Sequence, residues 1–234
     1  MSIFPEVLGA IQAEHARRAI SGDLLLIGRQ RLEFYEMTDQ EFFARFPIAS
    51  FKALGASSFE GADLVWDLNK RPLPKTLEGI SDFIFDGSCL DNIFDPAQAL
   101  RSLSRMLRPG GRMILVEHGT AIQGALCVFS PEWFYDFFVA NDYLDCRITM
   151  MAFPKGGLYA GPWTPIPWQP YKDNEPTTAT PGTAIGDFMN VVIAEKGPDS
   201  TNDRAPMQAQ YRIMHGDSDD KYRDFWRNSK GCQP

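Results

Sequence analysis

Short apolar runs alternate with segments of helical spacing along most of this chain. Residues 24–28 form an apolar run closed by glycine, which is typical of a strand buried on both faces of a parallel sheet. Similar runs predict further strands at 51–56, 63–66, 82–86, 112–117, 146–152 and 188–195. Apolar spacing and end signals predict helices at 5–20, 38–46, 96–107, 131–141 and 219–228. Strands and helices that alternate at this spacing predict βαβ crossovers and a mostly parallel sheet.

Local sequence signals mark the ends of several elements. Thr38 and Glu41 form a capping-box sequence, in which each side chain satisfies a free backbone N–H at a helix start. Ser130 and Pro131 are typical of an N-cap followed by the first helical turn. The Pro-Gly-Gly sequence at 109–111 breaks the preceding helix before the next strand begins.

The segment 153–187 interrupts this regular order. It is rich in proline, glycine and aromatic residues, and so long an irregular stretch favours a functional loop, a lid or a partner surface. Trp163 and Trp168 lie here, and two tryptophans can enclose an apolar or cationic ligand, or form the core of an interface with a second copy or another protein. We therefore expect a domain at 1–197 with an insertion at 153–187, and a polar extension at 198–234 whose one short helix docks on the body.

Composition and charge narrow the choice of partners. Hydrophobic residues make up 44% of the 234 residues and charged residues 23%, which is ordinary for a globular domain. The formal net charge of −7 argues against a nucleic acid as the main partner, and suits a neutral or cationic small molecule better. No apolar run reaches the roughly 18 residues of a membrane span, and the first residues lack a signal-peptide pattern.

Four cysteines, Cys89, Cys127, Cys146 and Cys232, lie scattered along the chain. None belongs to a C-x-x-C pair, so the sequence indicates neither a zinc site nor a redox motif, and we expect no bound metal. Scattered cysteines in apolar surroundings are typical of reduced core residues. Together with the absence of targeting signals, they predict a cytoplasmic protein.

The most informative stretch covers residues 81–117. It reads SDFIFDGSCLDNIFDPAQALRSLSRMLRPGGRMILVE and closely resembles the second half of class I S-adenosylmethionine (SAM) dependent methyltransferases, above all in its Leu-Arg-Pro-Gly-Gly turn. Residues 129–134 also resemble bacterial methyltransferase-like proteins of polysaccharide or small-molecule pathways. The resemblance covers about 22–153 and the final strand. It implies an α/β, Rossmann-like, doubly wound sheet of seven mostly parallel strands with a C-terminal antiparallel hairpin.

The same resemblance implies where SAM would bind. Ligands of such sheets lie at the carboxyl ends of the strands. The residues that match the family's cofactor positions are Gly28, Glu60, Asp67, Asp86 and Gly87. Glu60 would meet the ribose, Asp67 the adenine, and the Asp86–Gly87 loop the methionine end. Turn capping is the other interpretation of Asp67, and turn formation that of Asp86.

The first loop departs from the family's acidic residue and Gly-x-Gly-x-Gly pattern. Leu26 stands at the acidic position, and only Gly28 remains of the glycines, followed by Arg29, Gln30 and Arg31. Two interpretations stay open: SAM binds in a modified pocket, or the site has been reassigned or lost. A loop that still presents backbone N–H groups would favour the first, and an arginine that fills the pocket would favour the second.

His118 is the leading candidate for a general base, because its ordinary pKa suits proton transfer and it follows a strand at the ligand rim. Glu117 could orient its ring; a loop histidine bonded to backbone is the alternative. Asp91 could face the substrate or lie in a solvent-facing turn.

The leading prediction is a SAM-dependent methyltransferase acting on oxygen or nitrogen of a small molecule, such as a sugar or a secondary-metabolite intermediate. Two alternatives stay open: a catalytically silent subunit that binds a protein partner through 153–187, and an enzyme that reuses the pocket for other chemistry. Fold alone does not decide among them.

Overall fold

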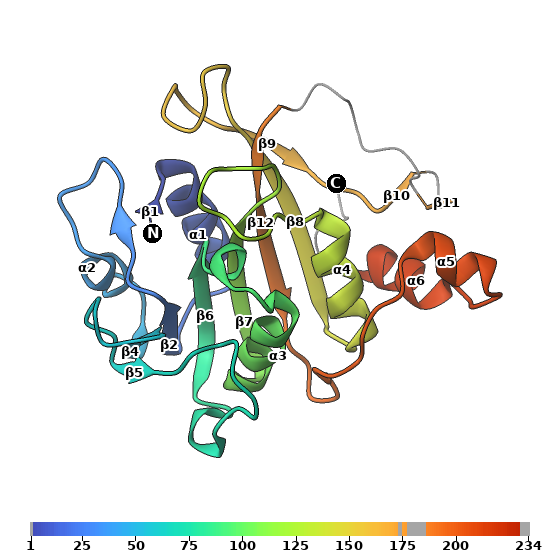
Figure 1. Cartoon of the computed structure of the whole chain (residues 1–234), viewed down its shortest axis with the longest axis horizontal. Coiled ribbons are helices and arrows are strands. Elements are labelled where there is room, and N and C mark those ends of the chain that lie inside the picture. Colours follow the sequence, from blue (N-terminus) through green and yellow to red (C-terminus); the bar gives the residue numbers. More distant parts are fainter. Residues whose placement is uncertain (1, 173–174, 177–185, 230–234) are drawn as a thin grey trace.

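An eight-stranded sheet forms the centre of the computed structural model, which describes residues 2–172, 175–176 and 186–229. The strand order is β5-β4-β2-β6-β7-β12-β8-β9 (Figure 1). The first five of these are parallel, whereas β12 runs antiparallel to both β7 and β8, and β9 runs antiparallel to β8. The strands in chain order are β2 (Gly22–Ile27), β4 (Ile48–Gly55), β5 (Leu64–Val65), β6 (Ser81–Gly87), β7 (Leu107–His118), β8 (Asp145–Ala152), β9 (Thr164–Pro167) and β12 (Phe188–Glu195).

This sheet confirms the predicted fold class, a doubly wound and mostly parallel sheet ending in an antiparallel pair. All seven predicted strands are present. The eighth, β9, comes from the segment that was predicted to be irregular. Two small sheets lie outside the main one: β1 (Ser2–Ile3) pairs with β3 (Arg31–Leu32), and β10 (Tyr171–Lys172) pairs with β11 (Glu175–Pro176).

Helices cover both faces of the sheet. They are α1 (Pro5–Arg17), α2 (Asp39–Phe43), α3 (Pro96–Met106), α4 (Pro131–Ala140), α5 (Ala209–Met214) and α6 (Asp220–Asn228), with short 3-10 turns η1 (Lys75–Leu77) and η2 (Leu90–Asn92). The predicted capping box of Thr38 and Glu41 is present, although α2 spans only five residues. Among the described helices, none is both long and apolar enough to cross a bilayer.

The continuous apolar runs of the central strands contribute side chains to two hydrophobic cores, one on each face of the sheet. In β2, Leu24 and Leu26 pack with α1 and α2, whereas Leu25 and Ile27 belong to the core beneath α3 and α4. Because successive side chains of a strand point to opposite faces, a strand covered on both sides must be apolar throughout.

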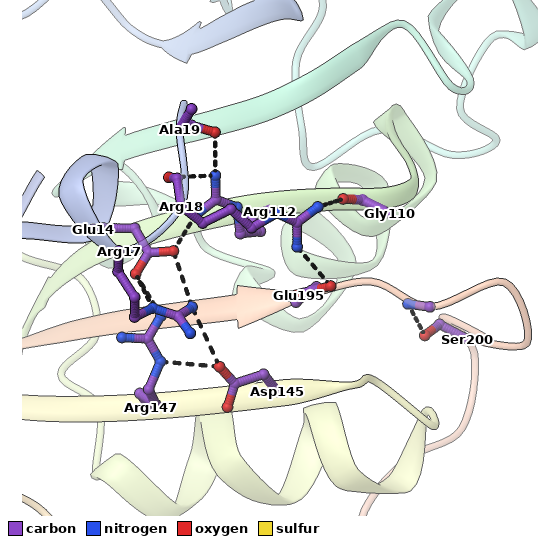
Figure 2. A network of polar contacts seen from close by, with 11 residues as sticks. Glu14, Arg17, Arg18, Ala19, Gly110, Arg112, Asp145, Arg147, Glu195 and Ser200 are labelled. Atoms are coloured by element: carbon purple, nitrogen blue, oxygen red, sulfur yellow. Dashed lines mark hydrogen bonds and ion pairs between the residues drawn. The ribbon is translucent and has the colours of Figure 1, made fainter. Parts of the chain in front are cut away.

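Ion pairs fix α1 to the end of the sheet where β7 and β8 begin. Glu14 is fully buried and accepts hydrogen bonds from Arg17, Arg112 and Arg147, while Arg147 also pairs with Asp145 (Figure 2). Burial would raise the pKa of Glu14, but the hydrogen bonds from Arg17 and Arg147 hold it below the ordinary value. This network closes the rim opposite to the carboxyl ends of the parallel strands.

The C-terminal extension docks beside α4 (Figure 1). The Tyr135 hydroxyl donates to the Tyr222 carbonyl at 2.6 Å, and the Arg212 guanidinium pairs with Asp136 and Asp219. Tyr171 of β10 also donates to Asp219 at 2.8 Å. The insertion and the extension therefore meet on the α4 side of the molecule.

Candidate functional site

The parallel strands β2, β4, β6 and β7 end at one rim of the sheet. Polar side chains gather where β6 and β7 end, next to the turn η2. Asp86 and Glu117 lie near the ends of these neighbouring strands, and Asp91 lies in η2. We refer to Asp86, Asp91 and Glu117 as the carboxyl cluster.

Backbone N–H groups hold the carboxyl cluster in place. Glu117 accepts from the N–H groups of Leu90 and Asp91 at 3.2 and 3.0 Å, and Asp86 accepts from Cys89 at 2.9 Å. The three carboxyl side chains are almost completely buried. The strand ends and the η2 turn therefore bring together groups that lie up to 31 positions apart in the sequence.

The carboxyl cluster is buried without a strongly basic partner, and this raises the pKa values of its side chains. Among the described residues, no lysine or arginine pairs with it. Burial raises the pKa of Asp86 to about 8, and it raises the pKa values of Glu117 and Asp91 as well. The second Asp86 oxygen has no hydrogen-bond partner among the described residues. Asp86 therefore favours its protonated form near neutral pH, and burial shifts Glu117 in the same direction.

His118 faces the carboxyl cluster from the end of β7. Its Nε2 lies 3.8 Å from a carboxyl oxygen of Asp91, so the group that faces the ring is Asp91, whereas the Glu117 carboxyl is taken up by backbone N–H groups. Burial lowers the pKa of His118, and the charge of Asp91 partly opposes this. A neutral imidazole at physiological pH is the form that can accept a proton.

The loop after β2 is held closed. Gly28 adopts a left-handed φ of +67°, and its N–H donates to the Leu54 carbonyl at 2.7 Å. Arg29 turns away to pair with Asp39 and lies over the Phe51 ring, whereas the Arg31 side chain is 80% exposed. Neither arginine fills the pocket.

Gln30 is the residue of this loop that turns inward. Its N–H donates to Asp39 at 2.8 Å, and its side-chain amide donates to the Ile27 carbonyl at 3.2 Å. A β-carbon added to Gly87 would lie 2.5 Å from Gln30 Oε1, so glycine is needed for this contact. The sequence prediction missed Gln30. Among the three polar residues at 29–31, glutamine is the uncharged one, so it can be buried without an ion partner.

Glu60 and Asp67 lie apart from the carboxyl cluster. Glu60 is exposed in the loop between β4 and β5, which contains no helix. Asp67 accepts hydrogen bonds from the backbone and side chain of Asn69, both at 3.0 Å, as a turn-capping residue does. Since β5 is three strands away from β6, Asp67 is separated from Asp86 by roughly 14 Å of sheet.

Trp163 and Trp168 are both buried and lie in different cores. Trp163 packs on Phe4 and Phe153 in the core of α1, whereas Trp168 packs on Tyr135 in the core of α4. They do not enclose one ligand between them. The rest of the insertion at 173–174 and 177–185 lies outside the described residues.

Metal-binding geometry is absent from the described residues, where no group of three or more histidine, cysteine or acidic side chains is arranged to hold an ion. Cys89, Cys127 and Cys146 are free, and Cys232 lies outside the described part of the chain. Desolvation of the Cys89 thiol beside Asp86 raises its pKa well above the ordinary value, so it stays uncharged.

Comparison with known proteins identifies the fold. The sequence matches no family model and no curated protein. A SAM-dependent methyltransferase of Thermotoga maritima, described as a possible histamine N-methyltransferase, is 15% identical with a TM-score of 0.50, over 81% of this chain and 87% of that one. The chain is also similar to the YcgJ protein of Bacillus subtilis, with 14% identity and a TM-score of 0.44 over 81% and 97% of the two chains.

The methyltransferase domain of the citrinin polyketide synthase is a further similar structure, at 13% identity and a TM-score of 0.49. The alignment covers 82% of this chain but only 52% of that one. The likeness to the Thermotoga maritima structure, at 15% identity and a TM-score of 0.50, concerns the fold alone: the chain has the fold of class I SAM-dependent methyltransferases.

Proposed function

We propose that this protein is a SAM-dependent methyltransferase acting on a small molecule. The observation that supports this proposal is the carboxyl cluster, which is buried at the ligand rim without a lysine or arginine partner among the described residues. A cation placed beside buried carboxyls makes their ionisation favourable, so this cluster suits a positively charged ligand. SAM carries its reactive methyl group on a positively charged sulfur.

The residues at the rim suit proton transfer from a hydroxyl or an amine. Methyl transfer needs aligned reactants and a dry site, and a hydroxyl acceptor needs a base as well. The neutral His118 ring would take the proton, and Asp91 would stabilise the imidazolium that forms. A sugar or secondary-metabolite intermediate, neutral or cationic, agrees with the net charge of −7.

The closed loop favours a second candidate, a catalytically silent subunit. The N–H groups of Gly28 and Gln30 are already engaged, and the Gln30 side chain occupies the space beside Gly87. The residues present therefore do not form the usual cradle for SAM unless Gln30 moves. Such a subunit would bind a second copy or another protein through the insertion at 153–187.

Calorimetric titration with SAM and with its demethylated product separates the two candidates. The wild-type protein is compared with Gln30→Gly, which empties the space beside Gly87, and with Arg31→Ala, which alters only an exposed position of the same loop. Micromolar binding by the wild type supports the methyltransferase. Binding by Gln30→Gly alone supports the silent subunit, since Gln30 would then block an otherwise intact site. If neither protein binds either ligand, the methyltransferase proposal fails.

A cytoplasmic location is part of the proposal, supported by the three free cysteines of the described chain. Localisation of a tagged protein by fractionation tests it.

A further inference from the structure

Four aromatic rings form a corner at the beginning of α1, away from the carboxyl cluster. Phe4 lies 6.3 Å from Phe34, 5.3 Å from Tyr159 and 4.8 Å from Trp163, measured between ring centroids, and Phe34 lies 6.5 Å from Tyr159. Phe4, Phe34 and Tyr159 are steeply inclined to one another, with interplanar angles of 56–69°. These rings form three walls rather than a flat stack. We call the four residues the aromatic corner.

The aromatic corner lines a hollow of about 210 Å³ that opens to solvent. Phe34 and Tyr159 are 71% and 65% exposed at its edge, whereas Phe4 and Trp163 are buried behind them. Because the two exposed rings adjoin each other and the buried pair, they form a contiguous apolar patch of the kind that marks ligand-binding grooves.

One carboxylate completes the lining of this hollow. Glu6 accepts a hydrogen bond from the Trp163 backbone N–H at 3.1 Å, which holds its side chain beside the rings. No lysine, arginine or histidine lines the hollow, and in the described part of the chain none of them forms an ion pair with Glu6. The aromatic faces and the carboxylate both favour positive charge.

The backbone at Phe34 is strained in a way that keeps its ring in this position. Phe34 has a left-handed φ of +67°, which is costly for a bulky residue without a compensating role. The pairing of β1 with β3 and the hydrogen bond from Glu33 to Ile3 hold this conformation. The strand pair therefore fixes the Phe34 wall against Phe4, as expected of a binding site formed before the ligand arrives.

We propose that the aromatic corner and Glu6 bind a quaternary or alkylated ammonium group of a small molecule. Rings at steep angles surround the alkyl groups, and Glu6 supplies the opposite charge. The hollow is built from the N-terminal segment, the loop after β3 and the insertion, whereas the carboxyl cluster is built from β6, η2 and β7. The proposal therefore does not rest on SAM binding.

Binding of choline, compared with its uncharged isostere dimethylbutanol, tests this inference in calorimetric or NMR titrations. The full chain should bind choline at least tenfold more tightly than dimethylbutanol, since only choline gains from the rings and from Glu6. Tyr159→Leu and Glu6→Gln should each weaken choline binding by about five- to tenfold. Tyr159→Phe retains the ring and should bind nearly as well as the wild type. Phe59→Ala removes an exposed ring elsewhere and should change nothing.

The proposal is overturned if choline does not bind at millimolar concentration, if dimethylbutanol binds equally well, or if Tyr159→Leu binds like the wild type. Glutamine at position 6 can still accept the Trp163 N–H, so a loss of binding in Glu6→Gln reports charge rather than folding. The Gln30→Gly variant should bind choline normally. Failure of choline binding and failure of SAM binding are therefore separate results.

Discussion

Asp86 lies fully buried at the end of β6 with a pKa raised by burial from 3.8 to about 8. The folded protein holds a proton there that the unfolded chain releases above about pH 4. This contribution to stability is complete in acid and is lost as the pH rises towards about 8. We predict that the free energy of unfolding falls over this range, and that Asp86→Asn flattens the dependence and stabilises the protein by on the order of 1–3 kcal/mol at pH 8.

Urea unfolding at a series of pH values measures this effect. Asp199→Asn at an exposed position is the matched control and should keep the wild-type profile. A variant Asp86→Asn whose stability follows the same pH dependence as the wild type would contradict the assignment of the retained proton to this carboxyl.

His118 offers a second residue-scale prediction. Burial lowers the pKa of His118, whereas the nearby Asp91 raises it. The His118 ring should therefore titrate below the ordinary value of about 6.5, and Asp91→Asn should lower its pKa further. Ring-proton NMR measures both, with Asp199→Asn as the control because this carboxyl is exposed and is not the one that faces His118. A rise of the His118 pKa in Asp91→Asn would exclude the proposed pairing.

The candidate site was predictable where it depends on the ends of strands. Asp86 and Glu117 end neighbouring parallel strands, so their proximity follows from the topology. The closed loop was not predictable, because the contact between Gln30 and Gly87 joins residues 57 positions apart and depends on glycine leaving room. Composition also does not indicate on which face of the sheet a tryptophan packs. Trp163 and Trp168 belong to the cores on opposite faces.

At the scale of elements, the predicted positions hold best where a segment is buried on one or both faces. The strands β2, β4 and β6 and helix α3 deviate from the prediction by at most three residues at either end, because their apolar pattern is what the core requires. The strand β7 begins five residues earlier than predicted, at Leu107. The helix predicted at 38–46 shortens to α2, and Phe46, which lies beyond its end, packs against the His15 ring. The strand β9 has two prolines among its four residues, and helix α5 spans only six residues, so neither carries a pattern that predicts it.

The attachment of α1 depends on Glu14, which meets three arginines at the closed rim (Figure 2). Replacing it by glutamine leaves Arg112 and Arg147 partly or fully buried without a balancing charge. We predict that Glu14→Gln lowers the free energy of unfolding by about 3–5 kcal/mol. Urea unfolding checks this value, with the exposed Glu132→Gln as control. A loss as small as that of the control would mean that water replaces the carboxylate at this rim.

At the scale of the whole molecule, the docking of the C-terminal extension on the rest of the protein depends on Arg212. This guanidinium lies between Asp136 and Asp219 and 3.4 Å from the centre of the Tyr222 ring. Burial raises the pKa of Asp136 to about 6 even with Arg212 present, so the two acids need this cation. Arg212→Ala should release α5 and α6 while the sheet stays folded.

Hydrogen exchange detected by mass spectrometry distinguishes this local release from global unfolding. Peptides of α5 and α6 should exchange at least tenfold faster in Arg212→Ala, and peptides of β6 and β7 should be unchanged. Arg223→Ala, which removes only a pairing with the exposed Asp220, is the control. Equal acceleration in β6 and β7 would mean that the extension is part of the cooperative core.

The two prolines of β9 have a consequence for how copies of this protein can meet. Trp168 donates its backbone N–H to the Ile148 carbonyl of β8. Because the backbone N–H groups of successive residues in a strand point to opposite sides, those of Ile166 and Thr164 also point towards β8. Pro165 and Pro167 occupy the positions that point away from β8. Proline has no N–H, and the outer margin of β9 therefore presents no amide donors at these two positions. A neighbouring chain cannot extend the sheet by strand addition here. An association at the β9 edge therefore has to use side chains, and this edge of the sheet is protected against edge-to-edge aggregation.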